Sequence, residues 1–69
     1  MRQWLIEKRN KKNLSQKILA ESCGISQQTY SAFEIGTRRP RPETAMKLGK
    51  LLGFNWTLFY MEKSFKDAG

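Results

Sequence analysis

The side chains best suited to chemistry in this chain are amides and guanidinium groups, and they gather in two places. Gln27 and Gln28 follow Ser26 at the start of a predicted helix, where packing does not require them. Further along, three arginines alternate with prolines in the stretch 37–42. Amides both donate and accept hydrogen bonds, and guanidinium groups stay charged at any physiological pH. These residues predict recognition of a hydrogen-bonding, anionic partner rather than covalent catalysis.

Nucleophilic and metal chemistry find little support in the composition. Histidine is absent and Cys23 is the only cysteine, so the chain lacks both the ligands of a structural zinc site and the partner for a disulfide. We interpret Cys23 as a small buried hydrophobic residue that completes an apolar helix face. There is also no convincing carboxylate pair and no phosphate-cradling glycine loop. We therefore expect neither an enzyme nor a bound metal or other cofactor.

The charge of the chain agrees with an anionic partner without identifying one. Thirteen Lys and Arg face 6 Asp and Glu, giving a formal net charge of +7 on 69 residues. Such a surplus on a small surface favours a polyanion such as nucleic acid. A basic surface that serves only solubility remains the alternative.

The stretch Ser15–Gly36 positions the two glutamines. Ser15 and Ser26 are suited to cap two successive helices, Gly24 allows a sharp turn between them, and Gly36 ends the second helix. Apolar residues recur at helical spacing on both sides of this turn, at Ile18, Leu19, Cys23, Ile25, Tyr30 and Phe33. Two short helices with a shared core, a turn with glycine and polar side chains on the second helix predict a helix-turn-helix.

The remaining pattern predicts three further helices and a compact all-α domain. Helices are expected over 2–12, 15–22, 27–35 and 42–52, with a fifth that starts after Asn55, and Asn13 should end the first in a left-handed conformation. Met46, Leu48, Leu51 and Leu52 are the residues of the fourth helix available to the core. Gly49 inside the same helix predicts a close approach by another helix. The domain should span 1–62, and 63–69 should fray.

These residues together resemble a known family. The matching positions are Leu14-Ser15-Gln16, Leu19-Ala20, Gly24-Ile25-Ser26, Glu34, Gly36, Arg39-Pro40, Pro42-Glu43-Thr44 and Leu52-Gly53. They are similar to the helix-turn-helix domain of lambdoid phage repressor and Cro proteins, also called the xenobiotic-response-element type. The similarity covers about 5–60. It implies a compact five-helix lambda-repressor-like domain, with the helix-turn-helix formed by helices 2 and 3, that binds operator DNA as a dimer.

The resemblance also implies roles for individual residues. The base-reading positions are Gln27, Gln28, Ser31 and Ala32 of the recognition helix 27–35. The phosphate-facing positions are Gln16, Lys17, Ser26, Arg38 and Arg39. Arg9 and Glu34 match an ion pair that joins helix 1 to helix 3, and an acid near a helix C-terminus does need such a partner.

The chemistry of these side chains supports the implied roles. A glutamine amide offers a donor and an acceptor side by side, which matches N6 and N7 of adenine in the major groove. Ala32 stands where relatives often carry a longer polar side chain, and its methyl group can touch a thymine methyl. Gly49 replaces the usual alanine and Arg41 the usual capping residue. Without the family framework, Gln27 and Gln28 could equally be solvated polar residues at a helix start.

These inferences favour a sequence-specific, double-stranded DNA-binding regulator, most simply a repressor. An antitoxin or restriction-modification controller that uses the same module is one alternative, and a protein-interaction module that has lost DNA binding is another. One recognition helix contacts few base pairs, so we expect a homodimer on a palindromic operator.

Aromatic residues near the end of the chain offer a surface for that dimer. Trp56, Phe59 and Tyr60, together with Phe65, supply more aromatic area than a small core needs. In the alternative arrangement Trp56 and Phe59 complete the monomer core and only Tyr60 is exposed. The chain shows no signal peptide or membrane-spanning stretch, so we expect a cytoplasmic location.

Overall fold

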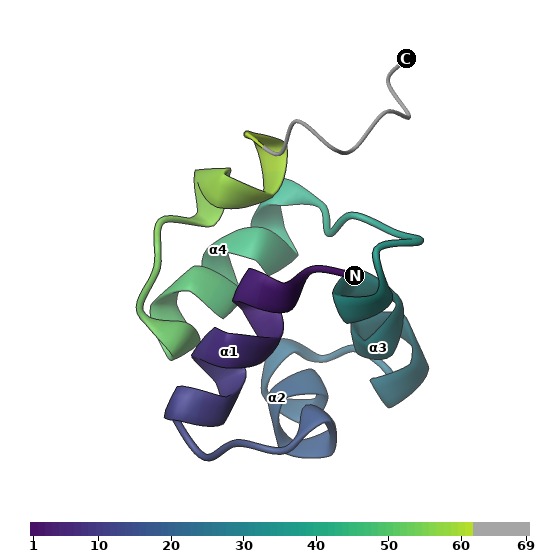
Figure 1. Ribbon diagram of the computed structural model, residues 1–69. Coiled ribbons are helices and arrows are strands. Elements are labelled where there is room, and N and C mark those ends of the chain that lie inside the picture. The colour runs from purple at the N-terminus through teal and green to yellow at the C-terminus, as the bar shows by residue number, and fades with distance from the viewer. Residues whose placement is uncertain (62–69) are drawn as a thin grey trace.

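Four α-helices and one 3₁₀-helix make up residues 1–61, the part of the chain that the computed structural model describes (Figure 1). In chain order they are α1 (Gln3–Lys11), α2 (Gln16–Cys23), α3 (Gln27–Ile35), α4 (Pro42–Leu52) and the 3₁₀-helix η1 (Trp56–Tyr60). These residues contain no strand, so the predicted all-α class is confirmed. The fifth helix is a short 3₁₀ segment rather than an α-helix. The predicted boundary at 62 and the tail 63–69 lie outside the described residues.

The helices surround one small core. In Figure 1, α1 crosses the front of the molecule, α2 lies below it, α3 lies to the right and α4 runs behind to the left. The N-terminus lies against α3, and η1 lies above α4. Because α3 sits at one side of the domain, one of its faces packs on the core and the other is open to solvent.

The predicted caps of the helix-turn-helix are present. The Ser15 hydroxyl accepts the backbone N–H of Ile18 at 3.1 Å, and the Ser26 hydroxyl accepts that of Thr29 at 3.1 Å. Gly24 between them has a φ of 73°, a left-handed conformation that glycine adopts without a Cβ penalty. These local bonds fix where α2 ends and α3 begins.

Among residues 1–61, ten buried apolar residues form the core. They are Leu5, Leu19, Ala20, Cys23, Tyr30, Phe33, Ala45, Leu48, Leu52 and Phe59. Cys23 is buried among them as predicted, but Ile18, Met46 and Leu51 are exposed. Each of these three lies on its helix next to a buried residue but outside the stripe that faces the core, because a helix in so small a domain buries only part of its circumference.

The prediction of a close approach at Gly49 is confirmed. A Cβ at this position would lie 2.6 Å from the backbone oxygen of Phe54 and 3.3 Å from the Cβ of Trp56. The neighbours are therefore Phe54, in the chain that leaves α4, and Trp56, the first residue of the helix η1. Any side chain at Gly49 would push this return segment away, which gives a physical reason for glycine instead of alanine.

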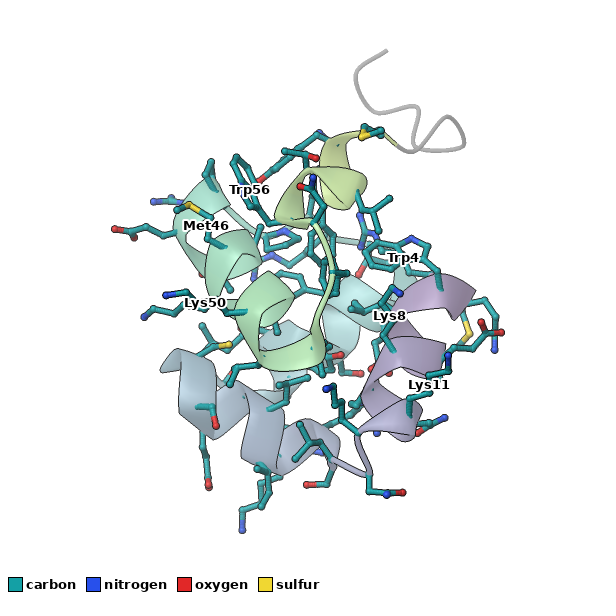
Figure 2. The ribbon with its side chains drawn as sticks, turned by 90° about the vertical axis from the view of Figure 1, so that its left-hand side faces the viewer. Trp4, Lys8, Lys11, Met46, Lys50 and Trp56 are labelled. Atoms are coloured by element: carbon teal, nitrogen blue, oxygen red, sulfur yellow. The ribbon has the colours of Figure 1, made fainter. Side chains whose placement is uncertain are left out.

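The side of the molecule away from α3 is basic and partly apolar. Figure 2 looks onto this side, with Trp4, Lys8 and Lys11 on α1 at the right and Met46 and Lys50 on α4 at the left. The positive charge is thus distributed over the whole domain and is not confined to the neighbourhood of α3. Net charge alone consequently does not locate the binding surface.

Candidate nucleic-acid interface

The start of α3 presents two fully solvated amides. Gln27 and Gln28 are exposed in its first turn, whereas Ser31 and Ala32, one turn further on, are half-buried. Gln27, Gln28 and Ser31 line a surface hollow together with Gln16 at the start of α2. The helix starts of the two halves therefore meet at one surface, and the four side chains offer several donors and acceptors within it.

Two of the predicted phosphate-facing cations project freely into solvent. Lys17 at the start of α2 and Arg38 after α3 are both exposed. Ser26 is exposed as well, but its hydroxyl is already used in capping, since it accepts the N–H of Thr29 and donates to the Thr29 hydroxyl at 2.9 Å. A contact of the Ser26 hydroxyl with phosphate would compete with the cap of α3.

Arg39 is placed differently from its neighbour. We refer to residues 37–41 as the basic loop. Within it, Arg39 is half-buried, and its guanidinium lies over the ring of Tyr60 at 5.3 Å from the centroid. The Tyr60 hydroxyl in turn donates to the backbone oxygen of Pro40 at 2.6 Å. The basic loop is therefore tied to η1, whereas its Arg38 side chain is exposed.

The ion pair between Arg9 and Glu34 is present and belongs to a larger cluster. Arg9 Nε lies 2.6 Å from Glu34 Oε2, which confirms the pair. The same carboxylate accepts the Tyr30 hydroxyl at 2.7 Å and the Gln16 side-chain amide at 2.8 Å. We call these four residues the Glu34 cluster. It joins α1, α2 and α3 beneath the surface that carries Gln27.

Electrostatics keep the Glu34 carboxyl ionised although it is buried. Burial by itself would raise its pKa, but hydrogen bonds from Arg9, Tyr30 and Gln16 favour the charged form, so the pKa of Glu34 is lowered. The pKa of Arg9 is raised by its hydrogen bond to Glu34. Burial and the same carboxylate raise the pKa of Tyr30, which therefore remains a neutral donor. The cluster is a fully hydrogen-bonded buried charge pair, the arrangement in which such a pair is tolerated.

Three contacts around α3 were missed by sequence reasoning. The apolar spacing predicts only a core role for Tyr30, although its spacing of four residues from Glu34 places both on one helix face and indicates that a bond is possible. Gln16 was assigned to phosphate, but its amide nitrogen is directed to Glu34. Arg2 was given no role, yet it is buried against the C-terminal end of α3, a placement that its position in the sequence does not signal.

Comparison with known protein families identifies the family to which this helical arrangement belongs. The family model described as helix-turn-helix matches residues 5–59. The chain belongs to the Cro/C1-type helix-turn-helix family. This is a family of DNA-binding transcriptional regulators rather than of enzymes, so the function predicted from the sequence is confirmed at that level.

Curated relatives of this helix-turn-helix protein carry matching names. It is 38% identical over 60 residues to the HTH-type transcriptional regulator YqaF of Bacillus subtilis (strain 168), covering 87% of this chain and 79% of YqaF. It is 40% identical over 45 residues to the cryptic phage CTXphi transcriptional repressor RstR of Vibrio cholerae, covering 65% of this chain and 40% of RstR. A second Bacillus subtilis regulator, YqaE, is 34% identical, and 54% of its length is covered. The chain thus spans about half or less of two of the three relatives. No solved structure matches significantly.

The aromatic residues of the helix-turn-helix domain divide between its interior and its surface. Phe59 is fully buried in the monomer core, so it is not available for the dimer contact in which it was placed. Trp56 is half-buried and lies edge-on to the ring of Tyr60, with centroids 5.9 Å apart. Tyr60 is 37% exposed. Only Trp56 and Tyr60 of the predicted contact therefore reach the surface, and Phe65 lies outside the described residues.

Residues 1–61 show neither a metal-binding cluster nor a membrane-spanning helix. No group of three or more potential metal-ligating side chains occurs there. No helix in this part of the chain is long and apolar enough to cross a membrane.

Proposed function

We propose that this protein is a cytoplasmic repressor that reads an operator in double-stranded DNA, with α3 in the major groove. The observation that carries the proposal is the pair of exposed amides at the start of a helix whose far end is anchored in a buried charge cluster. A helix held this way presents its first turn rigidly, and preorganised donors and acceptors lose little entropy on binding. The printed name of the relative RstR, a transcriptional repressor, supports repression as the outcome.

Gln27 and Gln28 are the proposed readers of base edges. Each amide can pair with N6 and N7 of adenine, and Ser31 and Ala32 lie one turn behind them on the same helix. The half-burial of Ser31 and Ala32 limits them to short-range contacts, such as that of the Ala32 methyl group with a thymine methyl. Sequence preference should therefore depend mainly on the two glutamines.

Lys17 and Arg38 are the proposed phosphate contacts, because both are charged and exposed on either side of the reading surface. Arg39 is proposed to contribute a further phosphate contact while its guanidinium stays over the Tyr60 ring. Gln16 reaches a phosphate only through the part of its amide that Glu34 does not use, and Ser26 only alongside its capping bond. Such contacts set affinity and register without selecting a sequence.

A homodimer on a palindromic operator completes the proposal. Trp56 and Tyr60 form its contact surface, and Met46 of α4 lies on the same side of the molecule as Trp56 (Figure 2). The two recognition helices should then lie about 34 Å apart, one turn of DNA. A dimer that binds two half-sites multiplies the sequence preferences of its two recognition helices. One short helix alone contacts too few base pairs to give that specificity.

Sedimentation and footprinting test the dimer. The protein is sedimented with and without operator DNA, and the half-site spacing is mapped by footprinting. We expect two protected inverted half-sites separated by one helical turn and two protein copies per duplex, and a Trp56→Ala, Tyr60→Ala variant should bind more weakly and less cooperatively. A protein that stays monomeric on DNA and protects a single half-site would rule out the dimer.

A further inference from the structure

We propose that Arg2 is a positioning residue for DNA binding, which holds the C-terminal end of α3 and the basic loop in one fixed arrangement. The inference rests on the proposed function, because the elements that Arg2 joins are the reading helix and the loop that carries Arg38. The structural evidence for it, however, consists only of the contacts that Arg2 makes.

The first observation concerns the carbonyl groups at the end of α3. The last four carbonyls of any α-helix have no partner within the helix. At the end of α3 the Ala32 oxygen accepts the backbone N–H of Gly36 at 2.9 Å. The Phe33 oxygen accepts Arg2 Nη1, and the Glu34 oxygen accepts the Arg2 backbone N–H at 2.7 Å. Arg2, which lies 31 positions before Phe33 in the chain, thus satisfies two of these four acceptors.

The second observation links the same side chain to the basic loop. Arg2 Nη1 also donates to the backbone oxygen of Arg38 at 2.8 Å. Its guanidinium lies 5.4 Å from the centroid of the Phe59 ring, which is itself fully buried. Arg2 as a whole is only 5% exposed. A single nitrogen therefore bridges α3 and the loop, and the core restrains the group that carries it.

The charge and shape of the side chain fit this role. A cation at a helix C-terminus is stabilised by the negative end of the helix dipole. The planar guanidinium can direct donors at two carbonyls while its face rests on an aromatic ring, which a lysine ammonium does not reproduce. The N-terminus lies beside α3 in Figure 1, so Arg2 joins the first residues of the chain to the end of that helix.

The consequence for DNA binding is that α3 and the backbone of Arg38 form one rigid unit, from which the exposed Arg38 side chain extends. Without Arg2, the loop loses the bond that holds the Arg38 carbonyl, and only the longer backbone bonds of Thr37 and Arg38 to the Ala32 oxygen, at 3.1 and 3.4 Å, still join it to the end of α3. The position of Arg38 relative to the bases that Gln27 faces is then less firmly fixed. Phosphate contacts depend on such register. Arg2 does not touch DNA in this scheme; it acts through Arg38.

A double-mutant cycle tests the scheme. Operator affinity and its salt dependence are measured for the parent, Arg2→Met, Arg38→Ala and the double variant, at a temperature where each is folded by circular dichroism. We expect Arg2→Met to weaken binding about tenfold and to lower the salt slope by about one charge. Arg38→Ala should then add little in the Arg2→Met background, because its contact is already lost. Lys11→Met, which removes one charge from the exposed outer face of α1 (Figure 2), is the matched control and should change affinity less than twofold.

A second variant and a second measurement keep the test decisive. Arg2→Lys retains the charge and should also reduce the effect of Arg38→Ala; it replaces Arg2→Met in the cycle should that variant not fold. Amide hydrogen exchange at Gly36–Arg38 requires no DNA and should accelerate in both Arg2 variants but not in Lys11→Met.

The outcomes separate this inference from the proposed function. Should the parent bind no DNA while exchange accelerates as expected, the proposed function fails, and only the structural link that Arg2 forms between α3 and the basic loop is supported. Should the parent bind DNA while Arg38→Ala costs the same factor in every background, the positioning role of Arg2 is refuted.

Discussion

The two ends of α3 differ in almost every physical respect. At its start, Gln27 and Gln28 are exposed. At its other end Glu34 is 3% exposed and accepts hydrogen bonds from three side chains, and Arg2 covers the last carbonyls. Because the far end is held by the rest of the domain, the exposed first turn is presented to a partner in a fixed orientation. The contrast shows how a nine-residue helix, too short to be stable alone, can present side chains in a defined geometry.

The largest expected effect comes from breaking the anchored end. Glu34→Ala leaves the partly buried Arg9 without its carboxylate partner and should cost about 3 kcal/mol of unfolding free energy. Denaturant unfolding measures this cost, with Glu21→Ala on the exposed face of α2 as the control for loss of a carboxylate. Equal stability of Glu34→Ala and the parent would show that the Glu34 cluster does not hold α3.

Acidification should lower the unfolding free energy through the same carboxylate, by less than the Glu34→Ala substitution does. The folded-state pKa of Glu34 lies below its unfolded value, which is about 4.3. The contribution of this carboxylate is therefore present above that unfolded value and is lost as the pH falls through the lowered folded value. The effect is smaller than that of deletion because a protonated carboxyl can still form some of its hydrogen bonds.

Thermal unfolding between pH 7 and pH 2 measures this loss. The parent should lose stability on acidification more steeply than Glu34→Gln, in which the position no longer titrates. Parallel curves for the two proteins would remove Glu34 from the account of acid stability.

A still smaller effect, on DNA affinity, is expected from a substitution at the exposed Arg38. Arg38→Ala should weaken binding to all DNA sequences alike and lower the salt slope by about one charge, because a phosphate contact carries no sequence information. Binding is measured at several salt concentrations, with Lys50→Ala on the far side (Figure 2) as the charge control. A loss that differs between operator and random DNA would instead make Arg38 a base contact.

Features that depend on nearby residues could be predicted from the sequence, whereas contacts that form where several helices meet could not all be predicted. The Ser15 and Ser26 caps and the left-handed Asn13 depend on neighbours within three or four residues, and all are present. The Arg9–Glu34 pair followed from an acid at an unfavourable helix end. The second function of Gln16 arises only when several helices meet, so no local pattern reports it.

The distribution of apolar residues shows the same limit. Trp56 and Phe59 are both aromatic and close in sequence, yet only Phe59 fills the core, where its ring lies 5.1 Å from that of Trp4. Helical spacing identified the apolar faces but not how wide a stripe of each is buried. That width depends on the neighbouring helices and, for Met46 and Leu51, left the side chains outside.

Parallel selection of binding sites from random duplex DNA tests most directly whether the free end of α3 reads sequence. The parent, Gln27→Ala and the control Gln3→Ala, which removes a glutamine from the start of α1 instead, are selected and sequenced side by side. The parent and the control should enrich the same inverted repeat. Gln27→Ala should lose preference at one base pair in each half and about 1–3 kcal/mol of discrimination there. An unchanged motif for Gln27→Ala, with the same ratio of operator to random binding, would contradict the assignment of the exposed end of α3 as the reader.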